Sequence, residues 1–222
     1  MASRTSATAA GSNPLQARPR WDNSPGKMSA TAKLADLISA AEYLERERAA
    51  ETRSEYINGV IVAMAGGTIA HDLIVGNIYA SINFQMRGRP CRVFTANMKV
   101  RIERANLFRY PDVSALCGPI ALHDSIGDVY LNPSFLCEVL SPGTEAYDLG
   151  EKFALYRLID SFVEYLVAAQ DRRFVQRFRR SQRGGWECME FTESEDVITL
   201  ESIGCSLRVA DIYDKVEVPP AA

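Results

Sequence analysis

A carboxylate interrupts a strongly apolar run of this sequence. The run 135–140 reads Phe-Leu-Cys-Glu-Val-Leu, and such a stretch is typical of a central β-strand that is covered on both faces. The interruption is Glu138. Because an isolated buried carboxylate is strongly unfavourable, Glu138 must be paired, protonated or bound to a metal ion. We interpret it as a candidate catalytic or metal-binding residue, with a buried partner of an arginine as the alternative.

A second carboxylate lies at the start of another predicted strand. Asp112 follows Pro111, whose fixed backbone angle favours an extended entry into the strand 112–117. If the two strands are neighbours, a suitable register places Asp112 and Glu138 on the same face, because side chains alternate. Two such carboxylates repel unless one is protonated or a cation lies between them. Taken alone, Asp112 is also compatible with an ordinary turn residue at a strand end.

These two acids predict phosphodiester chemistry if a hard divalent cation joins them. Mg²⁺ accepts oxygen-rich ligand sets, and it can polarise a phosphodiester and activate water. Lys152 is the leading candidate for a cation that orients the water or stabilises negative charge in the transition state. By itself, Lys152 would be interpreted as a solvated lysine on a helix.

Two further features have both a structural and a functional interpretation. His71 lies on the amphipathic helix predicted over 69–86, where it either packs with a hydrogen bond or contacts a phosphate or a metal ligand. The stretch 172–180 mixes basic and aromatic residues, and Arg173, Arg177 and Arg179 are candidates for contacts with the DNA backbone. A solvated, charged β-hairpin explains this stretch equally well. Serine or cysteine hydrolases are disfavoured because no histidine is placed for nucleophilic catalysis.

The elements that must position these residues alternate between helices and strands, which predicts one mixed α/β domain over 34–218 with a central sheet flanked by helices. A capping box at Ser39 and a turn at Asn58-Gly59 mark the first helix and the first hairpin. A second capping box is expected at Asp148 and Glu151. Helices are expected over 40–47, 69–86, 145–158 and 211–213, strands over 91–96, 99–103, 112–117, 134–140 and 163–169, and a meander over 174–179, 186–191 and 197–200.

Composition excludes several classes of protein. The 222 residues are 47% hydrophobic and 24% charged, values typical of globular proteins, and no apolar window is long enough to span a membrane. The net charge of −3 provides no overall attraction for nucleic acid, although a local site remains possible. Residues 1–33 are expected to form a disordered tail. The five cysteines are interpreted as buried free thiols, which favours a reducing, cytoplasmic location, and their spacing disfavours zinc.

From Ser39 to Val216 the sequence resembles the Uma-two-type restriction endonuclease family of the PD-(D/E)XK superfamily. The most specific match is the run from Cys137 to Glu145, which is followed by Asp148, Glu151-Lys152-Phe153 and Tyr156. Further matches are the stretches 54–59 and 63–67, His71, the run Tyr110-Pro111-Asp112-Val113-Ser114, Glu164-Tyr165 and the closing Asp211-Ile212-Tyr213.

The resemblance implies a restriction-endonuclease-like core with a C-terminal β-meander. It implies that Asp112 belongs to the "PD" element, that Glu138 is the acid of "(D/E)XK", and that Glu55 joins the acidic cluster. The sequence departs from the pattern at position 140, which is Leu instead of Lys. The resemblance places the missing lysine on the following helix, which fits Lys152, with Lys99 as the fallback.

We therefore expect a Mg²⁺- or Mn²⁺-dependent DNA endonuclease in which Glu55, Asp112 and Glu138 bind the metal and Lys152 assists the attack of water. A homodimer is expected because nucleases that cut both strands are often dimeric. The alternative is a catalytically inactive DNA-binding or protein-interaction module on the same fold. A weaker alternative is an interaction protein whose meander pairs with a second copy.

Overall fold

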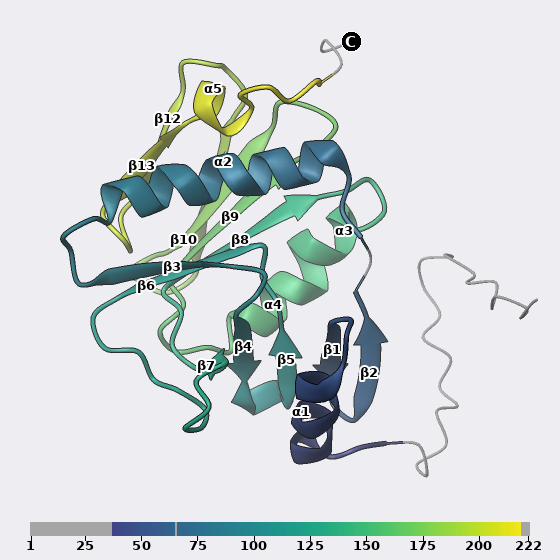
Figure 1. The fold of residues 1–222 in the computed structure, drawn as a ribbon. Helices are drawn as coiled ribbons and strands as arrows, with labels where there is room; N and C mark the ends of the chain where they lie inside the picture. The colour runs from purple at the N-terminus through teal and green to yellow at the C-terminus, as the bar shows by residue number, and fades with distance from the viewer. Residues whose placement is uncertain (1–36, 65, 219–222) are drawn as a thin grey trace, which may run out of the picture.

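Two large β-sheets and one small one form the framework of the protein (Figure 1). The computed structural model describes residues 37–64 and 66–218, so the predicted tail 1–33 lies outside the described residues. The six-stranded sheet has the order β11-β10-β9-β8-β6-β3. Its strands are β3 (Cys91–Thr95), β6 (Val113–Cys117), β8 (Phe135–Leu140), β9 (Glu164–Ala169), β10 (Val175–Arg180) and β11 (Trp186–Phe191). It is mixed, because β8 and β9 are parallel whereas β6 and β8 are antiparallel.

The five-stranded sheet has the order β2-β1-β5-β4-β7. Its strands are β1 (Ser54–Ile57), β2 (Val60–Ala63), β4 (Lys99–Ile102), β5 (Leu107–Arg109) and β7 (Val129–Tyr130). Helix α1 (Ala40–Ala49) packs on this sheet through a cluster of Tyr43, Tyr56 and Phe108. The Ser39 hydroxyl accepts a hydrogen bond from the Glu42 N–H at 3.1 Å, and Asn58 and Gly59 have φ angles of 44° and 101°. The predicted helix cap and hairpin turn are therefore confirmed.

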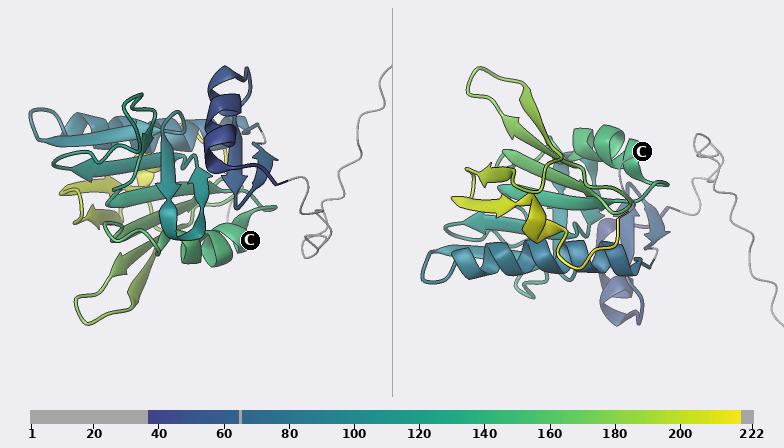
Figure 2. Two further views of the ribbon diagram at one scale, coloured as in Figure 1. Left: turned by 90° about the horizontal axis from the view of Figure 1, so that it is seen from below. Right: turned by 90° about the horizontal axis from the view of Figure 1, so that it is seen from above.

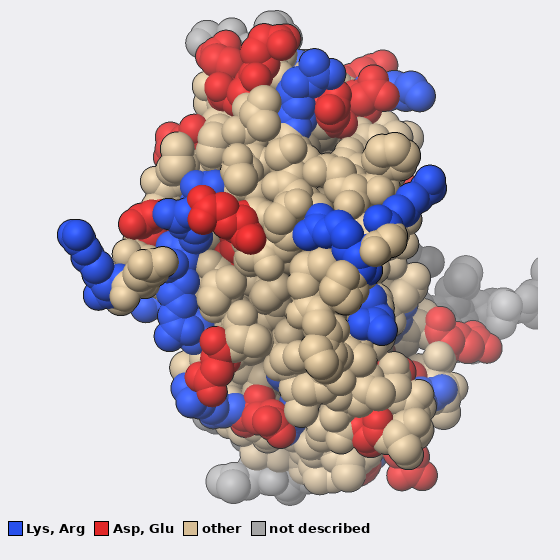
Figure 3. Space-filling model, turned by 90° about the vertical axis from the view of Figure 1, so that its left-hand side faces the viewer, with Lys and Arg blue, Asp and Glu red and all other residues tan. Residues whose placement is uncertain are grey.

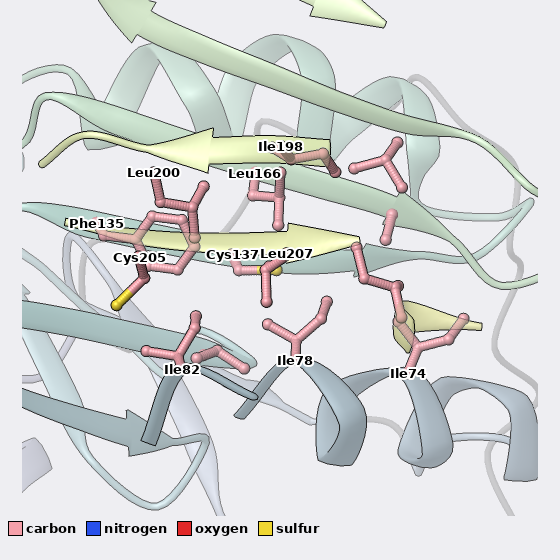
Figure 4. Packing of buried hydrophobic residues seen from close by; sticks show 14 of the residues in the cluster. Ile74, Ile78, Ile82, Phe135, Cys137, Leu166, Ile198, Leu200, Cys205 and Leu207 are labelled. Atoms are coloured by element: carbon pink, nitrogen blue, oxygen red, sulfur yellow. The ribbon is translucent and has the colours of Figure 1, made fainter. Parts of the chain in front are cut away.

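Strand β8 is buried along its whole length, as the apolar run predicts, because helical segments cover both faces of the six-stranded sheet. On one face lies α2 (Ile69–Gln85), together with the small sheet of β12 (Val197–Leu200) and β13 (Cys205–Arg208) and helix α5 (Val209–Ile212) (Figures 1 and 2). Figure 4 shows the packing of this face, with Ile74, Ile78 and Ile82 of α2 directed toward Cys137 and Leu166.

The opposite face is covered by a helical segment with three parts. These are α3 (Glu145–Tyr147), the π-helical turn η3 (Asp148–Lys152) and α4 (Phe153–Tyr156). Phe153, Tyr156, Phe162 and Tyr165 form an aromatic cluster there. Since Glu138 shares the parity of Leu136 and Leu140, its side chain lies on this second face.

Several expectations about the elements were wrong. Strand β12 pairs with β13 and not with β11, so the expected meander ends after β11. Strand β5 was not predicted because its three residues, Leu107–Arg109, are too few to show a period. The expected capping box at Asp148 and Glu151 is absent, because Asp148 lies inside a continuous helical segment and is buried. The two-residue strand β7 was not predicted either.

The cysteine interpretation also needs correction. Cys91 and Cys117 face each other across β3 and β6 and form a disulfide. Cys137 and Cys205 are buried free thiols, as expected, but Cys188 is exposed. The argument for a reducing compartment relied on five free thiols and loses its basis. No helix within the described residues is long and apolar enough to cross a membrane.

The packing of α2 leads to a stability prediction. Ile78 is 0% exposed, so Ile78→Ala should lower the free energy of unfolding by roughly 2–5 kcal/mol, because it leaves a cavity between α2 and the sheet. Ile69 on the same helix is 82% exposed, and Ile69→Ala should change it by about 0.5 kcal/mol or less. Urea denaturation of both variants measures the difference. Equal effects of the two substitutions would contradict the described packing of α2.

Candidate functional site

A cavity of about 390 Å³ opens where the end of the six-stranded sheet meets β1, β5, the start of α2 and the segment α3–η3. Five of the side chains singled out from the sequence line it: Glu55, His71, Asp112, Glu138 and Lys152. They come from separate parts of the chain, and the fold brings them to one place. The predicted convergence of the acids on one cavity is therefore what the structure shows.

The two central acids are side by side because of the pairing of β6 with β8. Val113 pairs with Cys137 in this antiparallel ladder, and extending the register by one residue places Asp112 opposite Glu138. The Oδ2 atom of Asp112 accepts a hydrogen bond from the Val139 N–H at 2.8 Å and lies 3.1 Å from His71 Nε2. The other oxygen, Oδ1, has no hydrogen-bond partner within residues 37–64 and 66–218.

Glu138 is the buried acid of the pair. Its Oε1 accepts a hydrogen bond from the Tyr156 hydroxyl at 2.6 Å, and its Oε2 lies 2.9 Å from Lys152 Nζ. Burial raises the pKa of Glu138 to about 8, although Lys152 opposes the shift; the charges of Asp112 and Asp148 raise the pKa further. The carboxyl group therefore loses its proton readily only when additional positive charge is present.

Lys152 is held between two carboxylates. The π-helical turn carries both Asp148 and Lys152, and Asp148 Oδ1 lies 3.1 Å from Lys152 Nζ. Burial alone would lower the pKa of Lys152, but the charges of Glu138 and Asp148 raise it above its usual value. Lys152 is therefore an ammonium cation at neutral pH. Single-turn π-helices are rare and are frequent at functional sites.

His71 contacts Asp112 from the first turn of α2. The Thr68 hydroxyl caps this helix by accepting a hydrogen bond from the His71 N–H at 3.1 Å. The cap fixes the start of α2 and thereby places His71 in its first turn. Its hydrogen bond to Asp112 raises the pKa of His71. A Cβ atom at Gly67 would lie 3.1 Å from His71 Nδ1, so a glycine there gives the imidazole room. His71 thus contacts Asp112 directly, and its functional role stays a prediction.

Glu55 lies in the cavity but in a different role from the expected one. Its carboxylate accepts hydrogen bonds from Arg109 Nη1 and from the Tyr110 N–H, the latter at 3.3 Å. Arg109 thus already engages Glu55, and metal binding by Glu55 stays a prediction. Within the described residues, no three His, Cys, Asp or Glu side chains are arranged to hold a metal ion.

The structure places the remaining candidates away from the cavity. Lys99 Nζ lies 2.8 Å from Asp128 Oδ2 and does not line the cavity, so the structure lends the fallback assignment of the lysine no support. Arg177 is buried and donates to the Thr199 carbonyl, and Arg179 pairs with Glu187 and Glu201. These partners occupy the two guanidinium groups that were expected to contact DNA. Arg173 is exposed and lies just before β10, outside the cavity lining.

The surface has no broad basic face in the view of Figure 3, where Lys and Arg side chains are interspersed with Asp and Glu. The hairpin of β10 and β11 extends away from the rest of the domain (Figure 2). Of the two interpretations of its arginines, the described ion pairs favour a charged, solvated hairpin.

The donors in the cavity fit a magnesium or manganese ion. Mg²⁺ usually takes only one or two carboxylates from the protein and completes its shell with water and substrate phosphate. Asp112 and Glu138 supply two such groups, and Asp112 Oδ1 lacks a partner in the described parts of the chain. The absence of a three-residue cage there is therefore compatible with this ion.

Four side chains that contact the candidate site residues were not singled out from the sequence as members of the site: Arg109, Tyr147, Asp148 and Tyr156. Asp148, Lys152 and Tyr156 follow one another at intervals of four, which places them on one side of a helical segment. That spacing was a usable signal. Arg109 and Tyr147 had none, because only the tertiary structure brings them together.

The shifted pKa of Glu138 predicts how stability depends on pH. The folded protein keeps a proton on Glu138 up to a pKa of about 8, whereas the unfolded chain loses it near 4.5. The stabilising effect of that proton is complete below about pH 4.5 and is lost as the pH rises toward about 8. The free energy of unfolding of wild type should therefore fall across this range relative to that of Glu138→Gln, which cannot ionise. Urea denaturation at several pH values measures this, with the exposed Glu187→Gln as control, and a constant difference between wild type and Glu138→Gln would contradict it.

Comparisons with known proteins identify the family of the chain. A family model described as "Putative restriction endonuclease", Uma2, matches residues 40–210. Two curated relatives come from Synechocystis sp. and have no assigned function. "Uncharacterized protein slr1290" is 31% identical over 176 residues, which is 79% of this chain and 91% of the relative. "Uncharacterized protein sll1609" is 32% identical over 149 residues, which is 67% of this chain and 82% of the relative.

A solved structure shares the fold. It is described as a putative nuclease belonging to DUF820 from Anabaena variabilis, and it superimposes with a TM-score of 0.64 at 20% identity. The match covers 79% of this chain and 97% of the Anabaena chain. The mixed α/β architecture expected from the sequence is thereby confirmed. With the family model matching most of the chain, the protein belongs to the Uma2 family of restriction-endonuclease-like proteins.

Proposed function

We propose that the protein is a Mg²⁺- or Mn²⁺-dependent DNA endonuclease of the PD-(D/E)XK type. The observation that carries the proposal is the pairing of Asp112 with Glu138 on neighbouring strands, with the Lys152 ammonium 2.9 Å from Glu138, at the wall of an open cavity. Membership of a family described by its restriction-endonuclease likeness supports DNA as the substrate.

Asp112 and Glu138 would hold the ion. When bound, the ion supplies Lewis-acid polarisation of the scissile phosphodiester and activation of water. The protein contributes the orientation of the two ligands: the Val139 N–H and His71 fix Asp112, and the Tyr156 hydroxyl fixes Glu138. The cost of burying a negative charge raises the pKa of Glu138. A positive charge beside the carboxylate offsets that cost and lowers the pKa.

Lys152 acts as a fixed cation and not as a general base. Its carboxylate partners keep it protonated, so it has no lone pair for accepting a proton from water. Its position beside Glu138 allows it to stabilise the negative charge that develops on the phosphate in the transition state. Substitution of Leu at position 140 for the usual lysine is compensated in this way by a lysine from the following helical segment.

A catalytically inactive module on the same fold is the second candidate. One observation favours it: both oxygens of Glu138 already have protein partners, Tyr156 and Lys152. Calorimetric titration with Mg²⁺ or Mn²⁺ separates the two candidates, since a module without a metal site gives no binding heat at millimolar concentration.

A homodimer that cuts both strands remains a prediction, which light scattering tests.

Cleavage of supercoiled plasmid tests the endonuclease. Wild type should convert plasmid to nicked or linear DNA with Mg²⁺ or Mn²⁺ and not with EDTA. Asp112→Asn and Glu138→Gln should each lower the rate by roughly 10²-fold or more, because each removes a charge that holds the ion while keeping the side chain's shape. Glu187→Gln, on the exposed strand β11, is the matched control and should cleave like wild type. Cleavage by Glu138→Gln at the wild-type rate would reject the assignment.

A further inference from the structure

We infer that Arg109 is a positioning residue that joins the wall carrying Asp112 to the helical segment carrying Lys152, and that Glu55 anchors this arginine instead of binding the metal. The inference rests on the proposed function, because it concerns the same cavity. It assigns a role to Arg109 and Tyr147 and a new one to Glu55.

One end of the connection is a cross-strand pair. Strands β1 and β5 are antiparallel, with Tyr56 opposite Phe108, so one further step of the register places Glu55 opposite Arg109. Arg109 Nη1 donates to Glu55 Oε2, and the neighbouring Tyr110 N–H donates to Oε1 at 3.3 Å. Tyr110 is two residues before Asp112. Glu55 thereby fixes the backbone that enters the strand of the catalytic acid.

The other end reaches the helical segment. Arg109 Nη2 donates to the Tyr147 hydroxyl, and the guanidinium carbon lies 5.7 Å from the centre of the Tyr147 ring. Tyr147 is the last residue of α3 and directly precedes the π-helical turn Asp148–Lys152. A single planar cation therefore contacts both the sheet wall and the segment whose next turn presents Lys152 to Glu138.

Burial explains why Glu55 has this role. Arg109 is only 3% exposed, and a buried guanidinium without a counter-charge is strongly unfavourable. Glu55 supplies that counter-charge. Both oxygens of Glu55 already accept hydrogen bonds, whereas Asp112 Oδ1 has no partner in the described residues. We therefore expect the ion to bind on the side of Asp112.

Metal binding tests the role of Glu55 directly. Mn²⁺ is titrated calorimetrically into wild type, Glu55→Gln and Asp112→Asn. Asp112→Asn should lose binding. Glu55→Gln should keep it, with a change in Kd below the roughly 10-fold that loss of a metal-supporting group typically costs. Loss of Mn²⁺ binding in a folded Glu55→Gln variant, while wild type binds, would overturn the inference and leave the proposed function intact.

Kinetics and hydrogen exchange test the role of Arg109. Arg109→Lys keeps the charge beside Glu55 but removes the planar fork that also reaches Tyr147, and Tyr147→Phe removes only the hydroxyl. Both should lower kcat for plasmid cleavage roughly 10- to 100-fold, with KM nearly unchanged, because Lys152 is misplaced. Both should also speed amide exchange in 145–156 and leave α2 unchanged. Arg104→Lys, whose side chain is 63% exposed, and Tyr79→Phe are the matched controls and should behave like wild type.

The outcomes separate the two proposals. Wild-type kcat, or unchanged exchange in 145–156, for folded Arg109→Lys and Tyr147→Phe would overturn the positioning role. An inactive wild type that binds no Mn²⁺, with the local increase in exchange still present, would reject the nuclease and support the mechanical connection through Arg109.

Discussion

The arrangement of the site depends on one buried acid, the carboxyl group of Glu138 in the centre of β8. The strand is covered on both faces, so this group has little access to water and needs compensation from the protein. Tyr156 and Lys152 provide part of it, while burial raises the pKa of Glu138. A site that still favours added positive charge is suited to bind a dication when substrate arrives.

The elements that cover the two faces of β8 differ in the groups that they offer to Glu138. The face toward α2 carries a large apolar cluster, whereas the opposite face carries the segment α3–η3–α4, which supplies Lys152 and Tyr156. The π-helical turn places Asp148 next to Lys152. The lysine is therefore balanced by two carboxylates, and a lysine on a neighbouring helix can replace one on the strand of the acid. On our proposal, Arg109 fixes the position of the segment α3–η3–α4. The position of that segment is then as important for the site as the identity of Lys152.

Many features of the fold and of the candidate site were predictable from the sequence, because they depend on short stretches of neighbouring residues. Glu138 in an apolar run and Asp112 after Pro111 were recognisable without neighbours, and turn and cap residues marked most helices and strands. What the sequence could not provide were pairings between distant residues. The ion pair of Glu55 with Arg109 and the disulfide of Cys91 with Cys117 both depend on which strands are adjacent. The pairing of β12 with β13 likewise depends on which strands are adjacent. The arginines of the β10–β11 hairpin were proposed as DNA contacts from their residue type alone, because the sequence does not reveal their partners.

We propose that a bound dication promotes the ionisation of the buried Glu138 carboxyl group, and the titration of this group tests the proposal most directly. The carboxyl carbon of Glu138 can be followed by ¹³C NMR against pH, with Glu138→Gln used to assign the signal. Without a divalent cation, the account predicts a pKa of about 8, and saturating Mg²⁺ should lower it clearly. A pKa near the ordinary 4.5 that does not respond to Mg²⁺ would contradict the account.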